Sequence, residues 1–367
     1  MLFRSKNWKF IQSFTVIDMD YGYVNARIRG MKSRLLDRHI LEDLIFQPDL
    51  DSLISDLEKT PYKEDIIEAK VLYQGVLCIE YALRKNFIRT FQKILEFVRE
   101  SEAERYIRIF LHRWDIQNIK TILRGKNIHV TNEEILDCLV PAGELDEVTL
   151  NELVRQPDVR AVIDLLATWG IGYAKPLTEK FPEYFEKSDL ALLECALDKY
   201  YYKEALESVK ITSYNTMLIR DILATEIDVV NLRTILRLIR DHVDSAEAQE
   251  FLIEGGKELT PKILNQFIAL HSIEEVIKEL EKTPYRFLAD VPEIAIKTQK
   301  ISVMEKQLEK FLIRKGVSAF SGDPLSVASV IGYFWAKYNE VTNIRIISRC
   351  KTVDLPDEQL KEELVYV

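Results

Sequence analysis

The chain contains few residues that interrupt helices. It has 12 glycines and 11 prolines in 367 residues, about half of the roughly 12% that these two residues make up in average proteins. No stretch is rich in Gly and Ser or in Pro, so flexible linkers are not indicated. Long segments of Leu, Ile, Glu, Lys and Arg, which favour helices, lie between the breakers. The sequence therefore predicts an all-α protein whose domains pack against each other.

Cysteines and long apolar runs are also scarce. Cys78, Cys138, Cys195 and Cys350 are far apart, and no pair has the spacing of zinc ligands. We expect reduced thiols and a cytoplasmic location. The longest weakly polar stretch, 327–336, is well short of the roughly 20 residues that cross a bilayer. The first ten residues also lack the apolar centre of a signal peptide, so we expect a protein that does not itself cross a membrane.

An excess of positive charge is missing as well. The chain carries 50 Lys and Arg against 59 Asp and Glu, a net charge of −9, which argues against nucleic acid as the main partner. One local exception is segment 25–38, in which five basic residues accompany only Asp37. Within it, Arg27, Arg29 and Lys32 are our candidate for a polar interface with a partner protein.

Motifs that carry chemistry are absent from the sequence. We find no P-loop, no Gly-rich dinucleotide turn and no G-x-S-x-G elbow. The five histidines are scattered and form no metal-binding pair at helical spacing, and no nucleophile has a neighbouring base. The sequence predicts no catalytic residue, no metal site and no cofactor.

What the sequence does contain is an internal repeat. Three segments begin at Asp49, Asp158 and Ser272, about 110 residues apart, a period far longer than that of the common helical repeats. In each, the capping residue is followed by apolar residues one, four, five and eight places later, as in a helix N-cap with one buried face. Segments 57–62 and 280–285 are identical, reading Leu-Glu-Lys-Thr-Pro-Tyr. We infer that one helical unit occurs three times.

A second repeated element carries an asparagine followed by a basic residue two places later. Its four copies contain Asn25 with Arg27, Asn118 with Lys120, Asn231 with Arg233, and Asn343 with Arg345. In one interpretation the asparagine binds backbone at a helix bend, and the basic side chains pair within the fold. In the other, these helices line a shared surface whose Arg and Lys side chains meet the carboxylates of a partner.

The fourth copy of this element has no capped half-helix after it. We therefore expect this C-terminal half-unit to complete the fold, beside the first copy, in either a closed pseudo-threefold body or an open stack. The predicted repeat units are residues 1–104, 105–217 and 218–367, the last of which includes the half-unit.

The repeat also allows two kinds of local prediction. Gly125 follows the element with Asn118 and is expected just beyond the end of that helix. Thr131 and Thr149 each precede a glutamate by three residues, which predicts a capping box at the start of a short helix in both places.

Three segments together resemble a known family. They are Tyr-Val-Asn-Ala-Arg-Ile-Arg-Gly-Met at 23–31, the Asn-x-Arg-Thr-Ile-Leu helix at 231–236, and the element at 340–349. These segments are similar to the C subunit of the archaeal and bacterial V-type (A-type) ATP synthase, whose eukaryotic relative is the d subunit of the vacuolar ATPase. The resemblance covers nearly the whole chain. It implies three similar helical domains in a pseudo-threefold, funnel-like arrangement.

The same resemblance implies a part of a rotary motor. Members of this family lie on the cytoplasmic face of the membrane, between the D and F subunits of the central stalk and the membrane ring of proteolipid subunits. They bind no nucleotide, catalyse no reaction and carry torque between ATP turnover and H⁺ or Na⁺ translocation. One copy per complex is expected, and a monomer when isolated.

Two other functions stay open at this point. The first is a helical scaffold for another multiprotein complex, although the period is two to three times that of common solenoid repeats. The second is a helical enzyme whose site is assembled from distant residues. The sequence does not distinguish H⁺ from Na⁺, or ATP synthesis from ATP hydrolysis.

Overall fold

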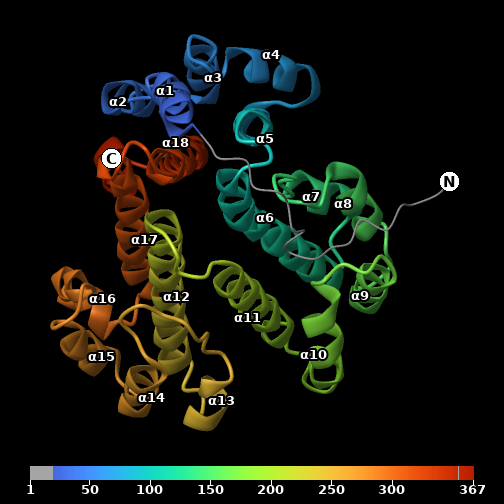
Figure 1. Cartoon of the computed structure of the whole chain (residues 1–367), viewed down its shortest axis with the longest axis vertical. Coiled ribbons are helices and arrows are strands. Elements are labelled where there is room, and N and C mark those ends of the chain that lie inside the picture. Colours follow the sequence, from blue (N-terminus) through green and yellow to red (C-terminus); the bar gives the residue numbers. More distant parts are fainter. Residues whose placement is uncertain (1–19, 354) are drawn as a thin grey trace. The chain divides into compact units, whose positions relative to one another are not determined.

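The computed structural model describes residues 20–353 and 355–367, and within these ranges all regular structure is helical (Figure 1). This confirms the all-α prediction. No helix in these ranges is both long and apolar enough to span a membrane. The first 19 residues, which include the segment examined for a signal peptide, lie outside the described part. The elements are α1 (Tyr21–Lys32), α2 (Arg38–Ile45), α3 (Leu50–Leu57), α4 (Lys63–Leu72), α5 (Gly75–Phe97), α6 (Glu102–Asn127), α7 (Asn132–Asp137), α8 (Glu147–Val154), α9 (Val159–Thr168), α10 (Ala174–Lys187), α11 (Ala191–Ser208), α12 (Tyr214–Arg240), α13 (Ser245–Gln249), α14 (Pro261–Leu270), α15 (Ile273–Leu280), η1 (Arg286–Asp290), α16 (Glu293–Lys297), α17 (Ile301–Val317), η2 (Ser318–Ser321), α18 (Ala328–Thr352) and α19 (Asp357–Glu363).

The three predicted capped half-helices are α3, α9 and α15. Their caps are Asp49, Asp158 and Ser272, and each side chain accepts a hydrogen bond from the backbone N–H three residues later. This bond satisfies one of the N–H groups that lack a partner at a helix start. The predicted apolar faces are buried: Leu53, Ile54 and Leu57 in α3; Val162, Ile163 and Leu166 in α9; Val276, Ile277 and Leu280 in α15.

The local predictions have mixed outcomes. The capping box of Thr131 and Glu134 is formed in both directions at the start of α7. Gly125 was wrongly expected beyond a helix end, since it lies inside α6. Its missing Cβ leaves room for Ile135, whose Cδ1 would be only 2.5 Å from that atom. Thr149 starts no helix either, because α8 already begins two residues before it.

The described chain divides into two compact units. The terminal unit holds residues 20–115, 137–146 and 313–367, except residue 354. The central unit holds residues 116–136 and 147–312. Helix α6 begins in the terminal unit and ends in the central one, and α17 does the reverse. The division into three repeat units follows from the sequence repeat and stays a prediction.

The terminal unit is built around α18, which packs against α1, α2, α3, α5 and α19 (Figure 1). The expectation that the C-terminal half-unit lies beside the first copy is therefore confirmed. Aromatic rings fill this core: the ring of Phe334 lies 5.0 Å from that of Phe91 and 5.6 Å from that of Phe110, centre to centre. Trp335, next to it on α18, is 1% exposed.

The central unit has a similar order of contacts. Helix α10 packs against α9 and α11, and α12 packs against α11, α14 and α15. Helix α12 buries side chains along most of its length, as a helix surrounded by others does. The two long helices α12 and α18 thus serve as the centres around which shorter helices pack.

Candidate functional site

The three basic residues proposed as a partner interface lie on α1 and are exposed. The same helix buries Val24 and Ile28 and packs against α18. Its apolar face therefore fixes the helix to the core, while Arg27, Arg29 and Lys32 project into solvent. We call these three residues the α1 basic surface.

Within the described ranges, no carboxylate pairs with the α1 basic surface. Arg27 Nη1 donates to the hydroxyl of Tyr23 at 2.6 Å, and Arg29 Nε donates to Oδ1 of Asn25 at 3.2 Å. The ammonium group of Lys32 lies 3.9 Å from the centre of an aromatic ring of η2. These contacts orient the side chains without neutralising their charge. In an acidic chain, the surface is a local site for the carboxylates of a partner.

Two of the repeated asparagines bind backbone. Asn231 Nδ2 donates to the carbonyl of Ile253 at 2.8 Å, and the N–H of Ile253 donates back to Asn231 Oδ1 at 2.8 Å. Asn343 makes the same pair of bonds with Val365, at 2.9 and 3.1 Å. Both asparagines are fully buried. Each satisfies both polar groups of a residue 22 places further on, which is an architectural role.

The other two asparagines have different surroundings. Asn118 is buried, with 2% of its surface exposed. Asn25 is half-buried on α1, where it accepts the hydrogen bond from Arg29. The first copy thus shares the sequence of the motif but faces its own helix.

The basic residues two places after the asparagines are partly paired within the fold. Lys120 is buried and binds Asp198 at 2.5 Å, and Arg345 binds Glu80 at 2.8 Å. Arg233 is half-buried, and its Nε has no hydrogen-bond partner among the described residues. This position therefore has no single role in the four copies.

The arginines six places after the last three asparagines have a common role. Each pairs with a glutamate of another long helix: Arg124 with Glu194 at 2.5 Å, Arg237 with Glu305 at 2.6 Å, and Arg349 with Glu80 at 2.8 Å. These ion pairs join α6 to α11, α12 to α17, and α18 to α5. The basic residues of these copies therefore hold the fold together, and the α1 basic surface differs from them.

Sequence reasoning missed the acid that precedes each of these three asparagines by three residues. The first is Asp115, which is fully buried and accepts the N–H groups of Glu144 and Leu145 at 2.9 and 3.0 Å. Gly143 is required beside it, since a Cβ there would be 2.1 Å from Oδ1 of the acid. Burial raises the pKa of Asp115 to about 6.

The second acid, Asp228, has the same arrangement in the central unit. It accepts the N–H groups of Glu258 and Leu259 at 2.8 and 3.2 Å, and the hydroxyl of Tyr285 donates to it at 2.9 Å. A Cβ on Gly256 would lie 2.2 Å from its Oδ1. Burial raises the pKa of Asp228, and burial together with the nearby carboxylate raises the pKa of Tyr285.

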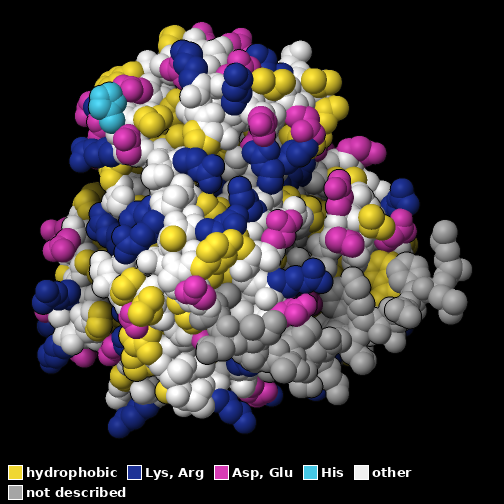
Figure 2. Space-filling model, turned by 45° about the horizontal axis from the view of Figure 1, so that its top comes forward, with side chains coloured by type: hydrophobic (Ala, Val, Ile, Leu, Met, Phe, Trp, Pro, Cys, Tyr) yellow, Lys and Arg dark blue, Asp and Glu magenta, His cyan; other side chains and the backbone are white. Residues whose placement is uncertain are grey.

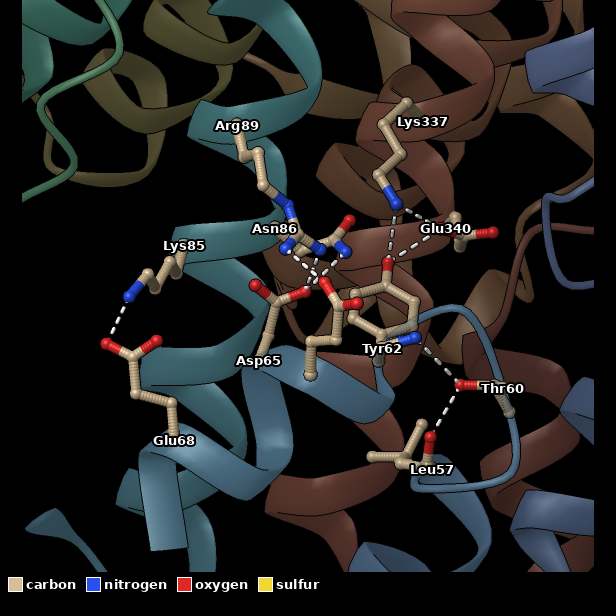
Figure 3. Close-up of polar contacts among 11 residues, drawn as sticks. Leu57, Thr60, Tyr62, Asp65, Glu68, Lys85, Asn86, Arg89, Lys337 and Glu340 are labelled. Atoms are coloured by element: carbon tan, nitrogen blue, oxygen red, sulfur yellow. Dashed lines mark hydrogen bonds and ion pairs between the residues drawn. The ribbon is translucent and has the colours of Figure 1, made fainter. Parts of the chain in front are cut away.

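The third acid, Glu340, joins distant parts of the terminal unit (Figure 3). It accepts the N–H of Leu36 at 2.5 Å and the hydroxyl of Tyr62 at 2.6 Å, and it pairs with Lys337 at 2.6 Å. The ammonium group of Lys337 also donates to the Tyr62 hydroxyl at 2.9 Å. Burial and the adjacent Glu340 carboxylate raise the pKa of Tyr62.

A second buried carboxylate lies beside this cluster in Figure 3. Asp65 Oδ2 accepts hydrogen bonds from Asn86 at 2.7 Å and from Arg89 at 2.8 Å. Burial raises the pKa of Asp65. The residues of both clusters satisfy one another, and Tyr62, Lys337 and Glu340 are at most 4% exposed. The arrangement serves to join helices, because its charged groups are already paired and closed off from solvent.

Two signals in the sequence could have pointed to these clusters. The acid at the third place before the asparagine recurs in three copies and is replaced by Gly22 in the first. The shared hexapeptide ends in Tyr62 and Tyr285, the two tyrosines that bind Glu340 and Asp228. Within the described ranges, no group of three or more His, Cys, Asp or Glu side chains could hold a metal ion.

Comparisons with known proteins cover almost the whole chain. The model of the ATP synthase (C/AC39) subunit family matches residues 24–363. The C subunit of the A-type ATP synthase of Methanococcoides burtonii is 36% identical over 351 residues, which is 94% of each chain. The corresponding proteins of Archaeoglobus fulgidus and Methanocaldococcus jannaschii are 32% and 31% identical. These matches cover 95% of this chain and 96% and 88% of theirs, respectively.

The match includes both structural parts described above, since it runs from α1 to α19. It contains the α1 basic surface, the bridging asparagines and the three buried acids. Nearly complete coverage of relatives by a helical chain of this order leaves one assignment. The chain belongs to the ATP synthase (C/AC39) subunit family.

Proposed function

We propose that this chain is a non-catalytic rotor subunit of an A-type ATP synthase, on the cytoplasmic face of the membrane. In this role it joins the D–F central stalk to the proteolipid ring and transmits torque between ATP turnover and H⁺ or Na⁺ translocation. The observation that carries the proposal is the match to the C subunit of A-type ATP synthases over almost the whole length of both chains.

The internal construction of the units supports a part that must be stiff. Buried bridges bind each long helix to distant backbone, as Asn231 and Asn343 do, and ion pairs link neighbouring long helices. Closely packed and fully bonded interiors deform little under load. A subunit that transmits torque needs this low compliance.

The α1 basic surface supplies a candidate contact with an acidic partner. Its three cations are exposed and form no ion pair within the described ranges, so a partner carboxylate would meet them without breaking an internal bond. Arginine suits this role because its guanidinium binds a carboxylate through two parallel hydrogen bonds. We propose that Arg27, Arg29 and Lys32 contact a partner subunit of the complex.

The test is co-purification of the tagged chain with the D–F stalk and, separately, with the proteolipid ring in lipid nanodiscs. Retention by both, as a single copy, is the expected result. A folded monomer that binds neither partner would overturn the rotor proposal and favour a scaffold of another complex.

A charge-reversal variant tests the α1 basic surface itself. Arg27→Glu, Arg29→Glu and Lys32→Glu together should weaken binding of one partner while leaving the helical circular dichroism signal unchanged. The matched control reverses Lys262, Lys278 and Lys282, three exposed lysines of the central unit, and so changes the net charge equally. Added salt should weaken the wild-type contact, because exposed charges are screened. Equal binding by both variants would contradict this contact.

A further inference from the structure

An apolar surface lies at the junction of α4 and α5 in the terminal unit. Ile67, Val71 and Leu72 on α4 are 50%, 81% and 61% exposed, and Leu77 at the start of α5 is 52% exposed. Gly75, between them, has a φ of 57°, which lets the chain turn sharply from one helix to the next. In Figure 2 hydrophobic side chains gather at the upper right, over this junction. We call Ile67, Val71, Leu72 and Leu77 the α4 apolar surface.

The charged residues of α4 point away from this surface and are neutralised within the chain. The pairs are Glu64 with Arg89, Asp65 with Arg89, Glu68 with Lys85, and Lys70 with Glu58. Figure 3 shows the first three on the side of α4 that faces α5. Ile67 and Val71, one helical turn apart, are thus bordered by ion pairs without net charge. Such a surface offers apolar contact and no electrostatic attraction.

Each repeat exposes apolar residues in the corresponding place. The element that follows the capped half-helix is α4 in the first copy, α10 in the second, and η1 with α16 in the third. Phe185 on α10 is 75% exposed, and Ile294 on α16 is 68% exposed. The α1 basic surface, in contrast, occurs once. A feature present in every repeat suits a partner that presents the same site many times, whereas a single feature suits a partner present once.

We propose that the α4 apolar surface, with Phe185 and Ile294 in the other repeats, docks on the proteolipid ring. This inference rests on the proposed function, and it assigns one of the two partners to a specific surface. The ring is the partner built of identical subunits, so it can meet repeated apolar side chains at equivalent sites. Affinity comes from apolar burial, and the contact is therefore insensitive to salt.

The experiment measures retention of tagged variants by the ring in lipid nanodiscs. Ile67→Ser, Val71→Ser and Leu72→Ser together should lower affinity at least about tenfold, because a few anchor residues carry most of an interface's binding energy. The control variant carries Leu325→Ser and Val353→Ser, which are 67% and 71% exposed elsewhere on the terminal unit. It should bind the ring like the wild type. Circular dichroism and gel filtration verify that both variants are folded.

Each outcome separates this inference from the function on which it rests. Failure of the wild type to bind the ring overturns the proposed function. Retention of the wild type together with equal retention of the triple variant overturns the α4 assignment and leaves the function intact. Loss of D–F binding in the triple variant assigns the surface to the stalk and also overturns it. Binding of the wild type to empty nanodiscs of the same lipid would replace the ring by the bilayer as the occupant.

Discussion

Glu340 is the residue whose replacement tests the architecture most sharply. The change Glu340→Gln keeps the size of the side chain and removes its charge. The buried ammonium group of Lys337 then loses its carboxylate partner, while the hydroxyl of Tyr62 stays within hydrogen-bond distance. The backbone N–H of Leu36 can still donate to the amide oxygen. The perturbation is therefore mainly an unpaired buried charge.

The expected cost follows from this burial. Lys337 and Glu340 are each 4% exposed, so water cannot replace the missing carboxylate. Removing one partner of a buried ion pair typically destabilises a protein by about 3–5 kcal/mol. Since the Tyr62 hydroxyl still solvates the ammonium group, we expect about 3 kcal/mol, which corresponds to a roughly 100-fold rise in local opening.

Hydrogen exchange followed by mass spectrometry measures this opening at the right place. Peptides that include Leu36 and Tyr62 should lose protection in Glu340→Gln, because Glu340 holds both residues. Peptides of the central unit should keep theirs. Urea unfolding of the same samples, followed by circular dichroism, gives the change in the free energy of unfolding.

A double variant separates the unpaired charge from the loss of hydrogen bonds. Lys337→Met with Glu340→Gln removes both charges and should recover most of the lost stability, since apolar replacement of a whole buried pair is often neutral. A loss of less than about 1 kcal/mol in the single variant, the size expected for exposed pairs, would refute the reasoning. The same conclusion would follow if the double variant were less stable than the single one.

Three other predictions concern the remaining bridges. Asn231→Ala should lower the free energy of unfolding by about 2–3 kcal/mol in urea, because the buried backbone groups it binds lose their partner. Gly256→Ala should destabilise the central unit strongly, since its Cβ would be 2.2 Å from the Asp228 carboxylate. Gly30→Ala, with no atom within 4 Å, should stabilise by up to about 1 kcal/mol, and thermal melting compares the two. Burial raises the pKa of Asp115 from 3.8 to about 6, so the folded chain binds more protons than the unfolded chain between these values. Stability should therefore fall as pH rises from about 4 to 6 and then level off, and Asp115→Asn should flatten this dependence in urea titrations; a slope that the variant leaves unchanged would contradict the assignment.

Local features of this fold could be predicted from the sequence. The caps at Asp49, Asp158 and Ser272 follow from short-range chemistry, and the apolar faces behind them follow from helical period. Gly125 shows where such reasoning fails. The residue has the type and position of a helix end, but close packing of Ile135 determines its use. That contact lies outside its own helix and leaves no local sign.

The bridges depended on contacts between distant residues. Tyr62 and Glu340 are 278 residues apart, and nothing local to either predicts the other. The motif of Asn25 matches that of Asn343, yet only the second binds backbone 22 residues later. The discriminating residue is the acid three places earlier, which the first copy lacks. On the surface, exposure of Val71 could not be inferred, because apolar helix residues are usually buried.

The bond between Tyr62 and Glu340 also sets a constraint on synthesis. A ribosome adds about 5–20 residues per second, so the 278 residues that separate the two take on the order of 15–55 s to be made. During that time α1 to α5 have left the ribosome without α18, the helix against which their apolar faces pack. The central unit, whose residues end at 312, is fully translated before α18 begins. The nascent chain therefore has its middle available for folding first, and its early helices are the segment most in need of a chaperone.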